Sequence, residues 1–175
     1  TTFRIYLPAA QGEVEEPGNA PRPAPSSTAV IDAAPSGKSL SRSDGKESIL
    51  IVDDDTFMLQ MTRDILERLG YQVETAEDGK AGIEVFAREA ERLNMVVLDL
   101  MLPELSGDEV FDAMREQRPD IRVLLISGHK RDPRIADLLA RGCDGFLNKP
   151  YSIEELSEAV RQILDRTKQM DSQLQ

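Results

Sequence analysis

The chain has 175 residues and a formal net charge of −11, with 40% hydrophobic and 30% charged residues. This length accommodates one compact domain with some irregular chain attached, and the composition is that of a globular protein rather than a fibrous or membrane one. The acidic balance disfavours binding to the phosphate backbone of nucleic acids, and no apolar run approaches the roughly 20 residues of a membrane-spanning helix.

The first 46 residues divide into a strand-like segment and a linker. Residues 1–7 alternate around β-forming residues and stop at Pro8, as a strand does. Residues 8–46 are rich in Pro, Ala, Gly and Ser and contain few large apolar residues, which is typical of a flexible linker. We therefore expect residues 1–7 to be the end of a truncated upstream domain, and the chain to be a fragment of a longer protein.

Short apolar runs alternate with segments of helical period from residue 48 onward. The expected strands are 49–52, 71–75, 95–98, 123–126 and 145–147. The expected helices are 56–69, 79–93, 107–117, 133–141 and 153–168. Five βα units with short connections predict right-handed crossovers and an α/β fold with a doubly wound, five-stranded parallel sheet.

Local signals mark several helix ends. Two S/T-x-x-E capping boxes are predicted at helix starts, namely Ser106 with Glu109 and Ser152 with Glu155. Gly70 and Gly142 stand where two helices are expected to end, because glycine readily adopts the left-handed conformation that closes a helix. These signals support the assigned helix boundaries.

The chain contains one cysteine and one histidine. Cys143 excludes an internal disulfide framework and agrees with a reducing cytosol. Because no histidine or second cysteine lies near it in sequence, we expect Cys143 to be a small residue in the turn before the last strand rather than a nucleophile. We expect His129 to be an exposed loop residue.

Polar side chains follow the expected strands at the edge where the working site of a doubly wound sheet lies. They are Asp53-Asp54-Asp55, Asp99, Ser127 and Lys149. Each has an ordinary explanation of its own: Asp54 or Asp55 as a helix cap, Ser127 as a loop hydroxyl, Lys149 as a solvated charge. Together they place several carboxylates, a hydroxyl and an ammonium at one edge, which chance composition seldom does.

Carboxylates that crowd together need a compensating charge. Two unit charges ~4 Å apart interact by ~4 kcal/mol at an effective dielectric constant of about 20. A hard divalent cation with oxygen ligands would neutralise this repulsion, and Mg²⁺ bound by carboxylates, phosphate oxygens and water is the usual arrangement. The sequence therefore predicts a Mg²⁺ site, with Lys149 left to pair with a further anion.

Four segments resemble the receiver domains of two-component response regulators, which have a flavodoxin-like (βα)5 fold. They are ILIVDDD at 49–55, VLDLMLPELSG at 97–107, ISG at 126–128 and NKP at 148–150. The resemblance implies a receiver domain over residues 47–168 and a C-terminal tail over residues 169–175. It also implies that Asp99 accepts a phosphoryl group from a phosphohistidine in a Mg²⁺-dependent reaction.

The resemblance further implies the ligands of the ion. Asp54 and Asp99 would bind Mg²⁺ directly, and the backbone carbonyl of Met101 would be a third protein ligand. Asp53 would act largely through water. Lys149 would pair first with the Asp99 carboxylate and then with the phosphoryl group.

Two residues are implied as switch positions. The Ser127 hydroxyl would bond a phosphoryl oxygen, and its movement would shift the loop Ser127–Asp132 and alter the face made by the fourth helix and fifth strand. Phe146, three residues before Lys149, matches the aromatic switch position. Phe146 also suits the core side of the last strand, and it has no hydroxyl to report on an inward or outward state.

The opening segment TTFRIYLP resembles the last strand of a histidine kinase ATP-binding domain. Together with the linker and the receiver, this segment implies the C-terminal end of a hybrid sensor histidine kinase. These residues would then be cytoplasmic, and the full-length kinase could be anchored in the membrane. The implied partners are a histidine kinase domain in the same chain or a histidine phosphotransfer protein, without contact to nucleic acid or membrane. Kinase motifs are missing from these residues, so we expect no kinase activity from them. Because the sequence ends soon after the last helix, we expect no output domain there.

Three other interpretations remain. A haloacid dehalogenase-type phosphatase would use Asp53 as nucleophile with Asp55 one residue further, but it would leave Asp99 without a role. A flavodoxin-like binding module would need a hydroxyl- and Gly-rich phosphate loop where three aspartates stand. A receiver-fold interaction domain that is never phosphorylated would not require the set of Asp54, Asp99, Ser127 and Lys149.

Two residues are expected to flank the water that would hydrolyse an aspartyl phosphate. They are Met101, two positions after Asp99, and His129, two positions after Ser127. Met101 is apolar and can hinder a water, whereas His129 can hydrogen-bond one or shield the site. From these opposite tendencies we expect a phosphoryl group of moderate lifetime.

Overall fold

The computed structural model describes residue 43, residues 46–129 and residues 132–171. The predictions for residues 1–7 and for nearly all of the linker lie outside these ranges. The described residues form one five-stranded parallel sheet in the order β2-β1-β3-β4-β5. Its strands are β1 (Ser48–Val52), β2 (Gln72–Ala76), β3 (Leu93–Asp99), β4 (Arg122–Ser127) and β5 (Gly145–Asn148). The predicted doubly wound parallel sheet is confirmed.

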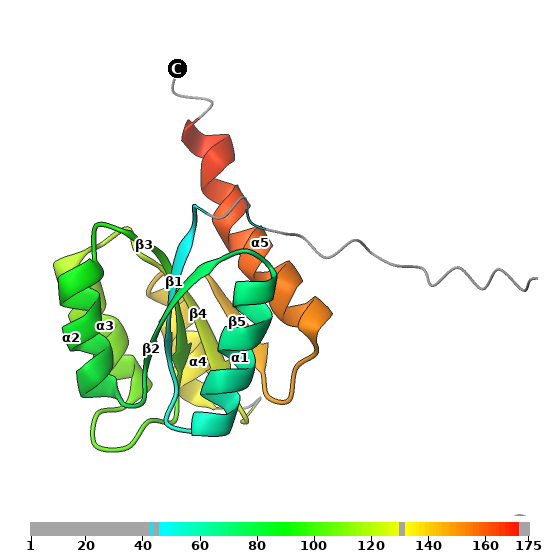
Figure 1. Ribbon diagram of the computed structural model, residues 1–175. Coiled ribbons are helices and arrows are strands. Elements are labelled where there is room, and N and C mark those ends of the chain that lie inside the picture. Colours follow the sequence, from blue (N-terminus) through cyan, green and yellow to red (C-terminus); the bar gives the residue numbers. More distant parts are fainter. Residues whose placement is uncertain (1–42, 44–45, 130–131, 172–175) are drawn as a thin grey trace, which may run out of the picture. The chain divides into compact units, whose positions relative to one another are not determined.

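Five helices cover the two faces of this sheet (Figure 1). They are α1 (Thr56–Arg68), α2 (Gly79–Glu89), α3 (Gly107–Gln117), α4 (Pro133–Ala140) and α5 (Ile153–Asp171). Apolar side chains of α1 and α5 pack on one face, and those of α2, α3 and α4 pack on the other. None of the helices in the described ranges is both long and apolar enough to cross a membrane.

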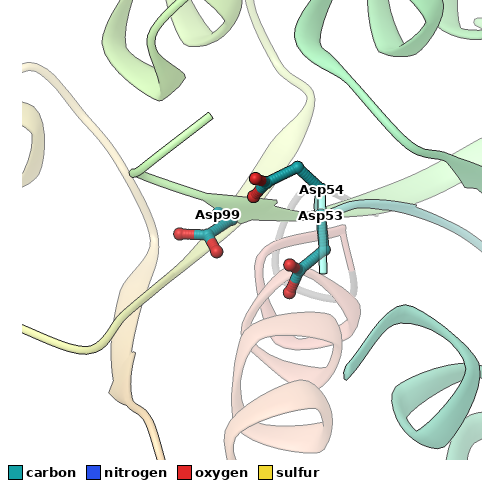
Figure 2. A group of neighbouring side chains, drawn as sticks. All are labelled: Asp53, Asp54 and Asp99. Atoms are coloured by element: carbon teal, nitrogen blue, oxygen red, sulfur yellow. The ribbon is translucent and has the colours of Figure 1, made fainter. Parts of the chain in front are cut away.

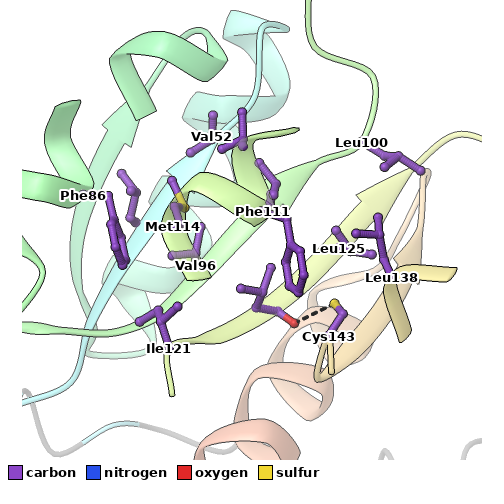
Figure 3. Packing of buried hydrophobic residues seen from close by; sticks show 14 of the residues in the cluster. Val52, Phe86, Val96, Leu100, Phe111, Met114, Ile121, Leu125, Leu138 and Cys143 are labelled. Atoms are coloured by element: carbon purple, nitrogen blue, oxygen red, sulfur yellow. Dashed lines mark hydrogen bonds between the residues drawn. The ribbon is translucent and has the colours of Figure 1, made fainter. Parts of the chain in front are cut away.

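Each face of the sheet has its own hydrophobic core. On the α2–α4 side, Phe86, Phe111 and Met114 pack against the strands (Figure 3). All three are at most 2% exposed. Because the central strands are covered on both faces, they read as nearly continuous apolar runs in the sequence.

The predicted helix-end signals are present. The Ser152 N–H donates to Glu155 Oε2 at 2.8 Å and the Glu155 N–H donates to Ser152 Oγ at 3.1 Å, which closes a reciprocal capping box. Gly70 and Gly142 have φ angles of 93° and 97°, in the left-handed region that favours glycine. These local features fix where the helices begin and end, and so where the loops of the site begin.

Two helix boundaries predicted from the sequence are wrong by three residues or more. The last helix was expected to end at residue 168, with a tail over residues 169–175, but α5 continues to Asp171 because no Gly or Pro interrupts the chain before it. The second helix was expected to extend to Leu93, but it ends at Glu89, and Leu93 is the first residue of β3. Leu93 is 1% exposed and pairs with Ser48 of β1, so its apolar side chain belongs to the sheet. The guanidinium of Arg118 donates at 2.6 Å each to the carbonyl of Ala90, at the end of α2, and to the carbonyl of Leu93, at the start of β3.

The register of the sheet brings four strand ends together. Asp99, the last residue of β3, lies beside Ile126 of β4, and Ser127 lies beside Asn148 of β5. On the other side of β3, Val52 at the end of β1 pairs with Leu98. The residues that follow β1, β3, β4 and β5 therefore meet at one edge of the sheet.

Candidate functional site

Three aspartates form the centre of this edge. Asp53 and Asp54 follow β1, and Asp99 ends β3, so the parallel pairing of β1 with β3 brings them together (Figure 2). One carboxylate oxygen from each of the three lies within 4.8 Å of the others. Asp53 and Asp99 are only 3% and 5% exposed, whereas Asp54 is exposed. Two of the three carboxylates are thus buried, and solvent reaches the cluster at Asp54.

Lys149, directly after β5, reaches into the cluster. Its Nζ lies 2.7 Å from Asp53 Oδ2 and also forms an ion pair with Asp99 Oδ2. The contact with Asp99 agrees with the placement expected from the sequence, and the contact with Asp53 was not expected. Burial acts to lower the pKa of Lys149, but the hydrogen bonds to both aspartates outweigh it and raise that pKa.

One ammonium does not balance three carboxylates. Burial raises the pKa of Asp53, the neighbouring charge of Asp99 raises it further, and Lys149 only partly opposes them. The buried edge therefore holds excess negative charge. Such a site favours an additional cation, and the available donors are carboxylate oxygens, the type that Mg²⁺ prefers. The acidic cluster of Asp53, Asp54 and Asp99 thus has the chemistry of a metal site.

Backbone N–H groups orient the two buried carboxylates. The Met101 N–H donates to Asp99 Oδ1 at 2.9 Å, and the Asp55 N–H donates to Asp53 Oδ1 at 3.1 Å. In each case one oxygen accepts from the backbone and the other faces Lys149. Asp99 is therefore held in one orientation by its own loop and by a residue 50 positions away.

Asp55 has a structural role. Its side chain accepts from the N–H groups of Phe57 and Met58 at 3.0 and 3.2 Å and caps α1. The ordinary explanation offered by the sequence, a helix cap directly after β1, holds for this residue. Its carboxylate points at the helix end and is not a member of the three-aspartate group.

Ser127 and His129 lie on the β4 side of the site. Ser127 is fully buried, and its Oγ accepts from the backbone N–H of His129 at 3.2 Å. Its carbonyl accepts from the Lys149 N–H at 2.9 Å, which links the ends of β4 and β5. His129 is exposed, as expected.

Phe146 and Cys143 lie away from the site edge. Phe146 of β5 is half-buried, pairs with Leu125 in register and packs against the core on the α2–α4 side. Cys143 is 7% exposed, and its Sγ donates to the Val123 carbonyl at 3.1 Å (Figure 3). Burial raises the pKa of the Cys143 thiol to about 11, so it is poorly suited to act as a nucleophile.

A hollow of about 660 Å³ opens next to the acidic cluster. Its wall contains Asp54 together with residues at the start of α2 and in the loops before α2 and α3, namely Glu77, Asp78, Lys80, Pro103, Glu104 and Leu105. Asp54 is the one member of the three-aspartate cluster that faces this space. The hollow therefore adjoins the acidic cluster at Asp54.

Sequence reasoning missed two contacts close to this edge. The Thr62 Oγ1 of α1 and the Tyr151 hydroxyl, two residues after Lys149, lie 2.6 Å apart. Arg134 of α4 donates to the thioether sulfur of Met101 at 2.9 Å. Neither contact joins sequence neighbours, and no periodic pattern or motif marks these residues.

Comparisons with known proteins agree with this geometry. The response regulator receiver domain model matches residues 49–161. Response regulator MprA of Mycobacterium leprae is 39% identical over 125 residues, 71% of this chain and 54% of that protein. Sensor kinase CckA of Brucella abortus is 28% identical over 166 residues, 95% of this chain and 17% of that protein. A crystal structure of a response regulator receiver domain protein from Clostridium thermocellum matches with a TM-score of 0.67 at 27% identity, covering 71% of this chain and 98% of that one.

The chain spans about half the length of the response regulators that it matches, as the 54% coverage of the Mycobacterium leprae protein illustrates. The family model matches residues 49–161, a range that includes the acidic cluster of Asp53, Asp54 and Asp99.

Proposed function

The chain belongs to the response regulator receiver domain family, and we propose on this basis that Asp99 accepts a phosphoryl group from a phosphohistidine in a Mg²⁺-dependent reaction. The observation that carries the proposal is the environment of Asp99. Its carboxylate is 5% exposed, accepts from the Met101 N–H, pairs with Lys149 and lies within 4.8 Å of two further aspartates.

The proposed transfer is a displacement at phosphorus. An Asp99 carboxylate oxygen forms a bond to phosphorus while the nitrogen–phosphorus bond of the phosphohistidine breaks, and the imidazole leaves with the electron pair. The protein mainly positions the carboxylate and neutralises charge on the phosphoryl oxygens. Lys149, already in contact with Asp99, is placed to pair with one of those oxygens as the new bond forms.

We propose Asp54, Asp99 and the Met101 carbonyl as the direct ligands of Mg²⁺, with Asp53 acting through water. When bound, the ion would neutralise phosphoryl oxygens and orient the donor group. The support lies in the oxygen donors of the aspartate cluster and in its excess negative charge. Asp53 has a further task, because its direct ion pair with Lys149 helps to hold the ammonium next to Asp99.

Signalling is proposed to start at Ser127. A dianionic phosphoryl group on Asp99 would attract the Ser127 hydroxyl, which now accepts from the His129 N–H. A change of this bond would move the loop before α4, and with it the face that contains α4 and Phe146 of β5. Phe146 is half-buried, so we expect its exposure to change when that loop moves.

The phosphatase alternative is weaker than the receiver. It requires Asp53 and Asp55 to act as a pair of carboxylates in the site. Asp55 is occupied as the N-cap of α1, and Asp53 is paired with Lys149. Membership of the receiver domain family supports Asp99 as the proposed acceptor instead.

Receiver domains work with histidine kinases or histidine phosphotransfer proteins, and we propose one of these as the phosphodonor. The similarity to sensor kinase CckA extends over 95% of the chain, which includes the first 46 residues in part. This similarity supports a hybrid sensor histidine kinase as the parent, with residues 1–7 ending its ATP-binding domain and residues 8–46 as linker. A cytoplasmic location follows from that assignment as part of the same proposal.

The experiment uses acetyl phosphate as donor and the purified chain, its Asp99→Asn variant and its Asp53→Asn variant. Intact mass with Mg²⁺ should show one added phosphoryl group on the parent, and none on Asp99→Asn. Reduction with borohydride followed by peptide mapping locates the site. The same incubation with EDTA should give little product. Labelling of Asp99→Asn at the parental level, or labelling that maps to Asp53, would overturn the assignment.

A further inference from the structure

Arg134, in the first turn of α4, connects three parts of the chain that border the site. Its Nε and Nη2 donate to the Asp132 carboxylate, with Nη2–Oδ2 at 2.7 Å. Its Nη1 lies 3.3 Å from Asp108 Oδ1 in the first turn of α3, and its Nη2 donates to Met101 Sδ at 2.9 Å. One guanidinium therefore joins the start of α4, the start of α3 and the loop after Asp99.

Two carboxylates on different elements keep this guanidinium in place. The side chains of Arg134 and Asp108 are about one third exposed, and that of Asp132 is 12% exposed. An isolated exposed ion pair contributes little, but a planar guanidinium that bonds two carboxylates at once is restricted to one orientation. The free Nη2 hydrogen is thereby directed at the sulfur of Met101.

Met101 needs such a partner because packing alone does not hold it. Its side chain is 48% exposed, although its backbone N–H is fixed to Asp99 Oδ1. Since β3 and β4 are neighbours and α4 follows β4, a thioether bonded to α4 lies over the rim between the ends of these two strands. Asp99 and Ser127 stand at that rim.

We propose that Arg134 is a positioning residue that holds the Met101 side chain across the rim beside Asp99 and thereby slows hydrolysis of the aspartyl phosphate. This inference rests on the proposed function of Asp99. In the hydrolysis, a water oxygen bonds to phosphorus and the bond between phosphorus and the Asp99 oxygen breaks. The products are inorganic phosphate, the Asp99 carboxylate and a proton released to solvent. An apolar thioether held over the rim obstructs the water without orienting it.

The main test is a double-mutant cycle on the rate of phosphate loss. Parent, Arg134→Ala, Met101→Ala and the double variant are phosphorylated with acetyl phosphate, freed of donor, and followed with saturating Mg²⁺. Arg134→Ala should lose phosphate about threefold to tenfold faster, the range expected when one hydrogen bond of ordinary net strength is removed. In the Met101→Ala background the same substitution should change the rate by less than about twofold, because the side chain it positions is gone.

Two variants separate positioning from charge and from general stability. Arg134→Lys keeps the charge but lacks the planar fork, so it should also accelerate phosphate loss. Arg88→Ala removes an exposed arginine of α2 and should leave the rate unchanged. A parental rate in Arg134→Ala or Arg134→Lys, or equal acceleration by Arg134→Ala with and without Met101, would overturn the proposal.

A second readout does not depend on phosphorylation. With ¹³C-methyl methionine, the Met101 methyl signal of the unphosphorylated protein should move toward its unfolded position and sharpen in Arg134→Ala. The signals of the buried Met95 and Met114 should stay in place and serve as internal controls. An unchanged Met101 signal would refute the positioning role even if Asp99 proved not to be the acceptor. Conversely, a shifted signal without phosphorylation of the parent would count against the proposed function alone.

Discussion

Arg161 of α5 and Glu47, the residue before β1, form a buried ion pair across 114 positions of the chain. Arg161 Nη2 lies 3.1 Å from Glu47 Oε1, and each residue is 8% exposed. Arg161 also donates to the Tyr71 hydroxyl at 3.3 Å and to Asp165. The ion pair therefore links the residue before β1 to α5.

Removing one partner of this pair should be costly. We expect Arg161→Met to lower the free energy of unfolding by about 3 kcal/mol, because it removes the guanidinium that bonds both oxygens of the buried Glu47 carboxylate. The double variant Arg161→Met with Glu47→Leu should recover at least half of that loss, since both charges are then absent. Urea unfolding of the four proteins measures the effect, and simple additivity of the two single losses would contradict it.

Asp54→Ala should weaken Mg²⁺ binding by about tenfold or more. Loss of a residue that only hydrogen-bonds a metal ligand already lowers metal affinity by about tenfold or more, and loss of a direct ligand should lower it at least as much. Without the ion, the variant should melt at a temperature no lower than the parent, since one charge leaves a repelling cluster. Thermal melts over a Mg²⁺ titration measure both. Glu91→Ala, which removes an exposed charge before β3, is the matched control. A parental Mg²⁺ titration for Asp54→Ala would exclude Asp54 as a ligand.

Gly107→Ala should destabilise the fold by at least about 2 kcal/mol, because extra volume in a tightly packed place forces the backbone to move. A Cβ at this position would lie 2.4 Å from the Asp99 carbonyl oxygen and 2.7 Å from the Leu100 Cα, both of which are backbone atoms. The affected backbone carries the proposed acceptor, so phosphorylation should slow as well. A Cβ at Gly128 would meet nothing within 4 Å, so Gly128→Ala should change stability by less than about 0.5 kcal/mol. Equal urea midpoints for the two variants would contradict the packing argument.

Cys143 should make the stability fall with pH above its unfolded pKa. The folded pKa is raised to about 11 from an ordinary value of 9.0, because burial disfavours the thiolate. The unfolded chain therefore loses this proton first, and the contribution of the thiol is complete below pH 9 and lost as pH rises through 11. The total is on the order of 3 kcal/mol.

The measurement for Cys143 is the slope of unfolding free energy between pH 9 and 11. Cys143→Ala should show a shallower slope than the parent, while both retain the contributions of Tyr71 and Tyr151, whose pKa values burial also raises. Identical slopes would mean that the thiol titrates alike in the folded and unfolded chains. The native thiol should also react slowly with iodoacetamide at pH 8.

The elements of this fold could be read from the sequence because their signals are local. The capping box of Ser152 and Glu155 and the glycine at position 70 act within a single turn of chain, and the apolar strand runs reflect burial on both faces. The prediction that the second helix extends to Leu93 was wrong because it, too, relied on local signals alone. The apolar side chain of Leu93 fits a helical period, and only pairing with β1 and the carbonyl contacts of Arg118 decide for the strand.

The sequence by itself determined which chemical groups stand at the ends of the strands, because an aspartate after a strand is a property of the chain order. Only the tertiary structure decided which of them touch. The strand order places β1 and β5 on opposite sides of β3, and Lys149 then spans to both Asp53 and Asp99. The bond from Arg134 to Met101 depends likewise on how α4 packs beside the loop after β3. Such contacts join residues 33 to 96 positions apart, and no short-range pattern encodes them.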